Sequence, residues 1–522
     1  MVDVNSIDLK NNFLRFKEDL LISKKYWLIY LCLVLFFITT NFNLINYLNP
    51  FFELIVLTIV SFGGVFCIVY YFGHNDDEEL YKTAFIIILI FGILCSLLMP
   101  IGSAPDEYEH IVRAEITSQG SLVPEYENGS YSSIRAISDL MNSIHQKRGE
   151  GYNLISVKNA TVFTNNVDTL PINYSDAHFV SAFAQNPFYG YLAQALGMDI
   201  AKLLDLNTIW LLWMGRICNL LLYAGLISYA VKKTPVIKVP FIIMACIPLA
   251  LYQSSSMSID ALINGLAFII IAYFFHMYKS PINSLTYKET LIFTVLCLLL
   301  GLTKITFFLF IFLLLLVPRG NFKKTEYYYF SLISIFTLGI IGYIWTTGYA
   351  QASFSQSYRL QYWIDHNVSS TNQLSYIFDH KKDFIVTVLN IPQYLDIDLI
   401  FNSRDLYFNS FNSVYLMFLG SVILMYPIKK QKLELRIGLF VFALVMYVAT
   451  YLTFLFTWTP AGQFNPIVGV QPRYFLPLFV LLPVIFSFNR FTGDKKRLDG
   501  IFITLTISFL ALMIISLIGS YY

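Results

Sequence analysis

Charged residues are scarce in this sequence. Of its 522 residues only 13% are Asp, Glu, Lys or Arg, whereas 57% are hydrophobic and 17% aromatic, and the mean hydropathy is +0.61. Soluble domains carry about 25% charged residues, so this composition excludes an ordinary soluble protein and predicts a polytopic membrane protein. The net charge of +2, without a long run of Lys and Arg, predicts no nucleic-acid partner and leaves membrane lipids as the expected surroundings.

Cysteine and the common catalytic signatures are also rare. The six cysteines lie singly in apolar stretches without a CxxC pair, which favours small core residues over a disulfide framework. The histidines lack metal-ligand spacing, so no metal site is predicted and no cofactor is required, although a divalent cation stays possible. The sequence contains no Walker loop, GxSxG elbow or dinucleotide fingerprint. No internal repeat is visible, so an inverted-repeat transporter gains no support.

Long apolar runs make up most of the remainder. A helix needs about 20 apolar residues to cross a bilayer, and the runs predict an all-α bundle of roughly thirteen spans by length and hydropathy. Several short pairs, such as 289–303 with 305–318, are also compatible with re-entrant segments. The expected spans are 26–47, 51–72, 83–100, 207–231, 239–256, 258–278, 289–303, 305–318, 327–349, 411–428, 434–457, 473–488 and 501–519.

The flanking charges orient these spans. Residues 1–25 alternate Lys and Arg with Leu and Phe, a pattern typical of a cytoplasmic interfacial helix, and residues 26–519 are expected to form one transmembrane domain. Short loops on one side hold most of the Lys and Arg, as cytoplasmic loops do. The sequence therefore predicts a multi-pass plasma-membrane protein with extracytoplasmic loops at about 101–190, 350–410 and 458–472. The first loop is too long to be structureless and should carry short helices.

One dense cluster of ionisable residues follows the third apolar run. The stretch DEYEHIVRAEI places Asp106, His110 and Arg113 on one face of a helix. Two interpretations remain open from spacing alone. The first is a capped interfacial helix with a solvated Glu109–Arg113 ion pair. The second is an active-site loop, in which Asp106 or Glu107 is a general base and the cation faces a lipid phosphate.

Other ionisable residues lie in or beside apolar stretches. Arg216, Lys304 and Arg473 are such cations, and a charge at the bilayer centre costs about 2.5–3.5 kcal/mol on insertion scales, so it usually has an anionic partner or a polar cavity. Together with Arg113 they predict a phosphate site. Lys304 is also compatible with snorkelling to the interface. Asp260, after a run of serines, is either a helix N-cap or an acid at membrane depth.

Several motifs, in their order along the chain, resemble one known family. The chain contains PDEYEH from Pro105, NPFYGYLAQALG from Asn186, MGRICNLLLY around Arg216, then SIDALING, LTKITFF and GVQPRYFLPL. Over about residues 95–490 this order resembles the bacterial membrane family catalogued as domain of unknown function 2142. That family is in turn similar to the GT-C glycosyltransferases.

The resemblance implies a GT-C-like bundle and an inverting enzyme. Such an enzyme takes a sugar from a polyprenyl-phosphate donor on the outer face of the bacterial cytoplasmic membrane, here for a cell-envelope glycan or lipid-linked acceptor. The resemblance assigns the catalytic carboxylate to Asp106 or Glu107. The alternatives are a lipid-linked oligosaccharide ligase or polymerase using the same groups, and a non-enzymatic glycolipid flippase or exporter. The residues expected at the donor phosphate are His110, Arg113, Arg216, Lys304, Gln471 and Arg473, with Asp260 and Tyr474 in support.

Overall fold

The fold is known from a computed structural model. It describes residues 14–40, 50–127, 129–145, 170–181, 183–184, 186–350, 358–394, 409–491 and 493–521. The first half of the expected interfacial segment 1–25 lies outside these residues, as do parts of the expected loops 101–190 and 350–410.

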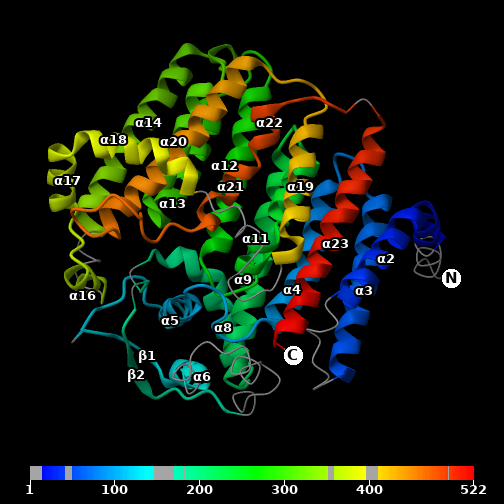
Figure 1. Ribbon diagram of the computed structural model, residues 1–522, viewed down its shortest axis with the longest axis horizontal. Coiled ribbons are helices and arrows are strands. Elements are labelled where there is room, and N and C mark those ends of the chain that lie inside the picture. Colours follow the sequence, from blue (N-terminus) through cyan, green and yellow to red (C-terminus); the bar gives the residue numbers. More distant parts are fainter. Residues whose placement is uncertain are drawn as a thin grey trace, which may run out of the picture.

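Nearly all of the described chain is helical, and the long helices run side by side as a bundle (Figure 1). Seven helices are long and apolar enough to cross a membrane, and an eighth candidate is the bent pair Leu14–Ile22 and α2 (Lys24–Thr40), whose halves meet at 69°. The seven are α3 (Pro50–Gly73), α4 (Leu80–Leu98), α9 (Ile209–Lys233), α12 (Asp260–Lys279), α14 (Thr325–Trp345), α20 (Leu433–Thr457) and α23 (Lys495–Tyr521).

The expected count of roughly thirteen spans exceeds this number because several apolar runs fold into shorter or broken elements. Prolines 248, 477 and 483 lie within such runs, and a proline removes a helical hydrogen bond and interrupts the helix. The short elements are α10 (Lys238–Ala245), α11 (Pro248–Ser254), α13 (Tyr287–Thr303), the 3₁₀ helix η4 (Ile305–Leu316), α19 (Asn409–Met425), the 3₁₀ helix η9 (Pro472–Phe475), α21 (Leu476–Phe479) and α22 (Leu482–Phe486).

Helix α9 is the packing centre of the half of the bundle that carries the site. It packs against α4, α12 and α8 (Leu192–Leu203). Glycines permit the close approach: a Cβ added at Gly197 of α8 would lie 2.2 Å from the carbonyl oxygen of Met214, and one at Gly92 would overlap Leu220. Small residues at crossing points are the usual means by which membrane helices bring their backbones together.

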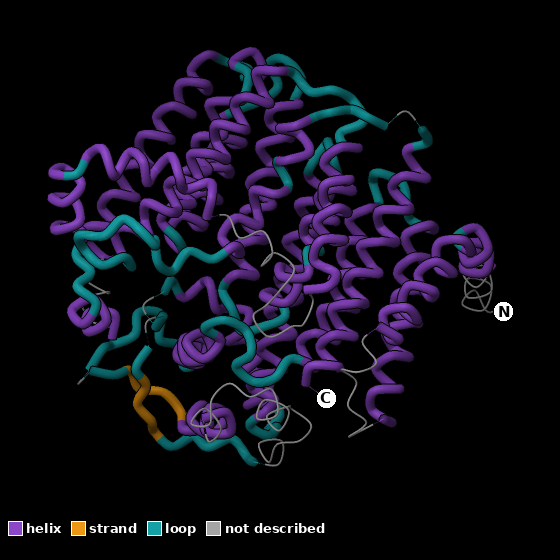
Figure 2. Tube along the Cα trace, viewed as in Figure 1, coloured by secondary structure: helices purple, strands orange, loops and turns teal. Residues whose placement is uncertain are grey.

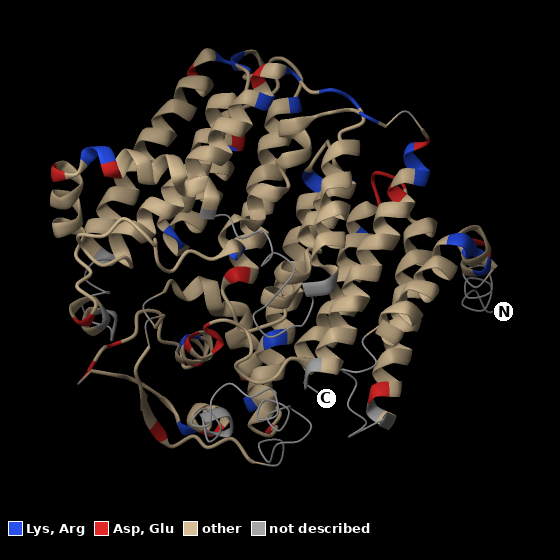
Figure 3. Cartoon of the chain, in the orientation of Figure 1, with Lys and Arg blue, Asp and Glu red and all other residues tan. Residues whose placement is uncertain are grey.

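Two ends of the bundle differ in what they carry. One end holds α5 (Glu107–Ser118), α6 (Arg135–His145), the short helix η3 (Phe188–Tyr191) and a two-stranded antiparallel sheet, in which Tyr131 of β1 (Tyr131–Ile134) lies opposite Phe179 of β2 (Asp176–Phe179) (Figure 2). This sheet is the exception to the expected all-α fold. Lys and Arg gather in the loops at the opposite end (Figure 3).

The second polar segment is also helical. It consists of α16 (Tyr358–Asp365), α17 (Ser370–Asp379), α18 (Lys381–Asn390) and the 3₁₀ turn η7 (Ile391–Tyr394). Figure 1 shows α17 and α18 at the left edge of the molecule. Two further short elements, η5 (Arg319–Asn321) and the π-helical turn Thr346–Ala350, flank α14.

Candidate active site

Asp106 lies at the start of α5, and its carboxylate is not used to cap the helix. It occupies the N-cap position in the left-handed backbone region (φ 59°), and its side chain makes no capping hydrogen bond. Aspartate tolerates this conformation better than most residues, although it is uncommon outside glycine. The side chain is 43% exposed. The capping role that the Asp106–Glu109 spacing suggests is therefore not realised, and the carboxylate points to another partner.

That partner is Arg473, which joins three distant parts of the chain. Its Nη2 donates to Asp106 Oδ2 at 2.8 Å, and its Nη1 lies 3.4 Å from Asp260 Oδ2 at the start of α12. The guanidinium is only 7% exposed. Its Nε and Nη1 are buried without a hydrogen-bond partner among the described residues, as is Oδ2 of Asp260. Buried polar atoms without a hydrogen bond are uncommon in folded proteins, and a functional role is one of the reasons for them.

Lys304 lies where α13 gives way to η4, and aromatic rings surround its ammonium. Nζ is 2.8 Å from the centroid of the Tyr474 ring and 5.8 Å from that of Phe454, and the two rings stack on each other 5.4 Å apart. Lys304 has no ion pair within the described chain. Because Tyr474 follows Arg473 directly, the two cations belong to one region.

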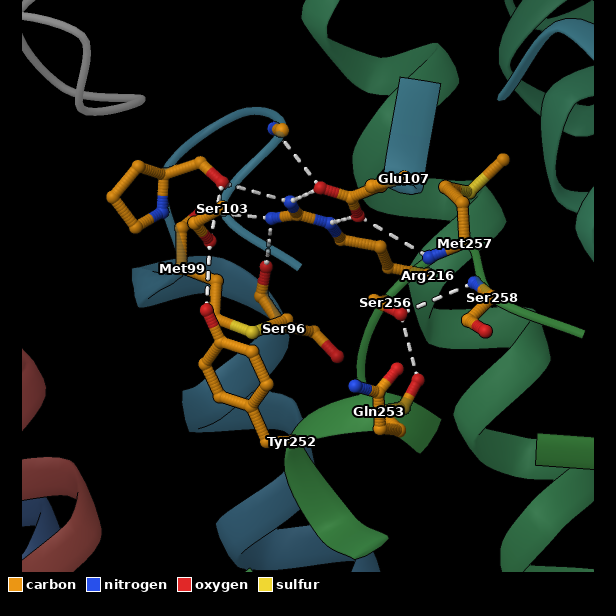
Figure 4. A network of polar contacts seen from close by, with 12 residues as sticks. Ser96, Met99, Ser103, Glu107, Arg216, Tyr252, Gln253, Ser256, Met257 and Ser258 are labelled. Atoms are coloured by element: carbon orange, nitrogen blue, oxygen red, sulfur yellow. Dashed lines mark hydrogen bonds and ion pairs between the residues drawn. The ribbon is translucent and has the colours of Figure 1, made fainter. Parts of the chain in front are cut away.

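In contrast, every N–H group of the Arg216 side chain already donates a hydrogen bond within the protein. Its Nε and Nη2 donate to the two carboxylate oxygens of Glu107 at 2.8 and 2.7 Å. Its remaining three N–H groups donate to the carbonyl oxygens of Ser96, Met99 and Pro100 at 3.0, 2.8 and 3.0 Å (Figure 4). A guanidinium has five N–H donors. The expectation that Arg216 binds a donor phosphate is therefore at odds with the geometry, because all five are used within the protein.

The carboxylate oxygens of Glu107 likewise accept all of their hydrogen bonds from protein groups. Besides the two bonds from Arg216, its Oε2 accepts the amide of Gly102 at 3.0 Å and its Oε1 accepts the amide of Met257 at 3.2 Å. Both side chains of the pair are completely buried. A carboxylate with every acceptor position filled is poorly suited to take a proton from a substrate. The pair instead ties the turn after α4 to α9 and to the loop before α12.

Arg113 also forms hydrogen bonds within the protein, and these join α5 to the loops around it. Its Nε donates to the carbonyl oxygen of Asn186 at 2.9 Å, and its two terminal nitrogens donate to Thr117 Oγ1 at 2.8 Å and to the carbonyl oxygen of Leu122 at 3.0 Å. The side chain is fully buried. Both expectations for Arg113, an exposed pair with Glu109 and a phosphate ligand, therefore disagree with the structure, because the guanidinium fastens α5 to the loops around it.

His110 is buried beside the site as a neutral imidazole. Nδ1 lies 2.8 Å from the Tyr191 hydroxyl and Nε2 3.3 Å from Ser258 Oγ. Burial lowers the pKa of His110 to about 4, against a smaller opposing effect from Asp260 and Asp106. The imidazole is therefore uncharged at neutral pH. The expected role as a cationic phosphate ligand does not fit this setting, although Ser258 Oγ also accepts the backbone amide of Asp260 at 3.1 Å and so links the ring to the site.

Sequence reasoning missed two amides that hold the loop between α11 and α12. Asn219 Nδ2 donates to the carbonyl oxygens of Ser256 and Ser258 at 2.8 and 2.9 Å, and Gln194 Nε2 donates to that of Met257 at 3.3 Å. Non-helical backbone at membrane depth is tolerated only where protein groups satisfy it. An Asn inside the apolar α9 is the sequence signal that could have indicated this loop.

Gln471 is the remaining expected ligand. It precedes η9, its carbonyl oxygen accepts the amide of Tyr474 at 3.1 Å, and its side chain is partly exposed. The structure thus brings together Asp106, Asp260, Lys304 and Arg473. Gln471 lies two residues before Arg473 in the sequence. Among the described residues no group of three or more His, Cys, Asp and Glu is arranged to hold a metal ion.

Comparison with known proteins addresses the family. No curated protein and no solved structure matches the chain. One family model does match, over residues 89–482, and is described as a predicted membrane protein, DUF2142. The match covers the helices that build the site, from the second half of α4 through α21, and the several membrane-spanning candidates agree with its description. The chain belongs to the DUF2142 family of predicted membrane proteins.

Proposed function

We propose that this protein is a GT-C-type glycosyltransferase of the bacterial cytoplasmic membrane. It moves a sugar from a polyprenyl-phosphate donor to a glycan or lipid-linked acceptor at the extracytoplasmic face, with inversion. One observation carries the proposal: an exposed, uncapped carboxylate, Asp106, lies 2.8 Å from a buried arginine whose Nε and Nη1 make no hydrogen bond within the described residues. Base and anion-binding groups are thus adjacent, as this transfer requires.

The chemistry assigns one task to each group. Asp106 accepts the proton of the acceptor hydroxyl while that oxygen attacks the anomeric carbon. The bond from this carbon to the phosphate oxygen breaks, and the lipid phosphate leaves with the electron pair. Arg473 offers Nε and Nη1 to that phosphate while its Nη2 keeps Asp106 in position. Lys304 supplies a second positive charge, and such preorganised charges stabilise a developing anion most in a site shielded from water.

Asp260 has a supporting task in this scheme. Lying 3.4 Å from Arg473 Nη1, it holds the terminal nitrogen that Asp106 does not contact. Two carboxylates around one arginine leave a net negative charge, which Lys304 balances in its protonated form. Glu107 stays outside the reaction because its acceptor positions are filled, so the geometry favours Asp106 as the base.

The orientation rests on the distribution of basic residues. The loops at the end of the bundle opposite α5 carry clusters of Lys and Arg (Figure 3), and short cytoplasmic loops are enriched in these residues. This distribution supports a position of the site at the outer side of the membrane. A donor with its polyprenyl chain in the bilayer and its sugar in the aqueous phase would reach the site from there.

The decisive experiment replaces Asp106 by Asn. The variant should lose sugar transfer by about 10²- to 10⁴-fold, the usual contribution of a general base, and still fold, because the side chain is 43% exposed. Purified protein in nanodiscs is supplied with a panel of undecaprenyl-phosphate hexoses, and release of undecaprenyl phosphate is followed by mass spectrometry. Glu109→Gln, three residues further along the chain and less than one turn away on the same helix, is the matched control.

Full activity of Asp106→Asn would refute the assignment of the base. Lipid extracted with the purified protein separates the proposal from its nearest alternative: a monophosphate-linked sugar supports the transferase, and a pyrophosphate-linked oligosaccharide supports a ligase or polymerase.

A further inference from the structure

We infer that α17 and α18 form a membrane-inserted hairpin, in which α18 descends into the lipid leaflet on the side of the site and steadies the loop that leads to Arg473. The inference concerns a lipid-contacting surface and its mechanical link to the site. It does not depend on which reaction the site performs.

The first step is the level at which the hairpin packs against a spanning helix. Helix α17 packs against α20, near its end, where Ser370 Oγ donates to the carbonyl oxygen of Phe456 at 2.9 Å. The turn η7, which follows α18, is held by Tyr447, whose hydroxyl donates to the carbonyl oxygen of Ile391 at 3.2 Å. Tyr447 lies about 15 Å along the axis from the end of α20, at 1.5 Å per residue.

This separation places the end of α18 at membrane depth. A hydrocarbon core is about 30 Å thick, and α20, at 25 residues, is about 37 Å long and overhangs it only slightly. The level of Tyr447 is therefore within the half of the core nearer the site. Because α18 begins beside the end of α17 and leads into η7, it runs from the membrane boundary towards that level.

The surface of α18 matches this path. Its outward face carries Ile385, Val386 and Leu389, the last 71% exposed. The polar residues Lys381 and Lys382 stand at its start and are exposed. Apolar residues towards the deep end and lysines at the boundary are the pattern of interfacial helices, which place basic side chains at the phosphate headgroups. Exposed apolar residues on the preceding helix, Leu374 and Phe378, extend the same surface.

The occupant of this face is the bilayer, because the face continues a lipid-facing surface. Directly along α20 from the hairpin, Phe440, Val441 and Val445 are also exposed and apolar, and they belong to a helix long and apolar enough to span the membrane. A surface that continues into these residues meets lipid, not water.

The hairpin is firmly fastened to the loop before Arg473. Gln373 is buried, its Nε2 donates to the carbonyl oxygen of Gln463 at 2.8 Å, and its Oε1 accepts the amide of Gly462 at 3.0 Å. Phe464 packs against Tyr376, with ring centroids 4.9 Å apart. The loop continues from Phe464 to Gln471 without a helix of its own, so these contacts decide where it lies.

The depth of α18 is measured with nitroxide labels on single introduced cysteines. The background is Cys32→Ser, Cys218→Ser, in which the four remaining cysteines are buried. In nanodiscs of phosphatidylethanolamine and phosphatidylglycerol, collision rates with oxygen and with a water-soluble nickel chelate are compared at positions 382, 385 and 389. The oxygen-to-nickel ratio should rise several-fold in that order.

The matched control for depth is a label at Tyr174, which is also large and exposed but lies in the segment before β2. Nickel should dominate there. If the label at 389 meets nickel as readily as the one at 174, the face of α18 is in water and the inference is wrong.

Hydrogen exchange of unlabelled protein tests the link to the loop. Gln373→Leu removes two buried hydrogen bonds, so amides 459–471 should exchange about five- to tenfold faster. Leu389→Asp should have the same effect in nanodiscs, because a charge placed at that depth lifts α18 from the lipid. Gln361→Leu, on α16, loses only an exposed bond to Asp365 and should leave the loop unchanged. Unaltered exchange in the first two variants would overturn the link.

Discussion

Removing the charge of Glu107 should lower the stability of the fold, whereas removing the charge of the neighbouring Asp106 should abolish sugar transfer and leave the stability nearly unchanged. Glu107→Gln replaces one acceptor oxygen by an amide group that faces the Arg216 guanidinium, and it removes the counter-charge of a cation with no exposed surface. Breaking a buried pair from one side costs about 3–5 kcal/mol, because the remaining charge is left uncompensated. Asp106→Asn alters a side chain that is 43% exposed, and Asp260 remains beside Arg473 as a second carboxylate, so the cost in stability should be smaller.

The assay combines stability and function in the same preparations. For a chain of this size the Glu107→Gln cost should lower the thermal midpoint on the order of 5 °C, seen as earlier loss of the monodisperse peak in size-exclusion chromatography after heating. Asp106→Asn should keep the wild-type midpoint and lose sugar transfer. Arg216→Met combined with Glu107→Leu should recover part of the lost stability, since apolar replacement of a buried pair is often neutral.

The opposite pattern would refute this reasoning. If Glu107→Gln folds with the wild-type midpoint and loses transfer, while Asp106→Asn keeps transfer, then the buried pair must open during the reaction. Glu107 would then be the base, and the saturation of its oxygens would describe only the resting state.

Three other perturbations test the remaining groups. Lys304→Met should weaken binding of undecaprenyl phosphate about tenfold, measured by native mass spectrometry, because a charge-assisted contact is lost; unchanged binding would exclude the ammonium from the phosphate site. His110 is held neutral, with its pKa lowered to about 4, so the unfolded chain binds a proton first and stability should fall as pH drops from about 6.5 to 4, by up to about 3 kcal/mol. His110→Gln should flatten that profile, and a profile identical to wild type would show that the ring does not cause it. Asn219→Leu removes the hydrogen bonds to the carbonyl oxygens of Ser256 and Ser258 and should lower the thermal midpoint. Ser280→Ala at the end of α12 should leave the thermal midpoint unchanged.

Composition and apolar runs were sufficient to predict a helical membrane protein, and each expected run contains helix among its described residues. The number of full spans could not be predicted in this way. Hydropathy does not distinguish a helix that crosses the bilayer from a pair that turns back within it, and the break between α13 and η4 at Lys304 is decided by tertiary packing. The small β1–β2 sheet was missed because four-residue strands carry little periodic signal.

The residues of the site were suggested by sequence, but their division of labour was not. Spacing along α5 leaves Asp106 and Glu107 equivalent, although successive side chains on a helix point about 100° apart. Only the position of Arg216, which is 109 residues away from Glu107 in sequence, shows that Glu107 faces the bundle interior. The left-handed backbone of Asp106 then turns the neighbouring carboxylate the other way, towards Arg473.

A cation in an apolar stretch is therefore ambiguous by itself, and counting its hydrogen-bond donors resolves the ambiguity. A buried guanidinium must be compensated whether its partner is a structural carboxylate or a ligand. Arg216 uses all five donors on protein atoms. Arg473 keeps two buried nitrogens unsatisfied beside an exposed carboxylate, at a cost in stability of about 1–3 kcal/mol for each unmade bond. Such a cost is retained most readily where a ligand removes it, and this argues for the anion site at Arg473 and against one at Arg216.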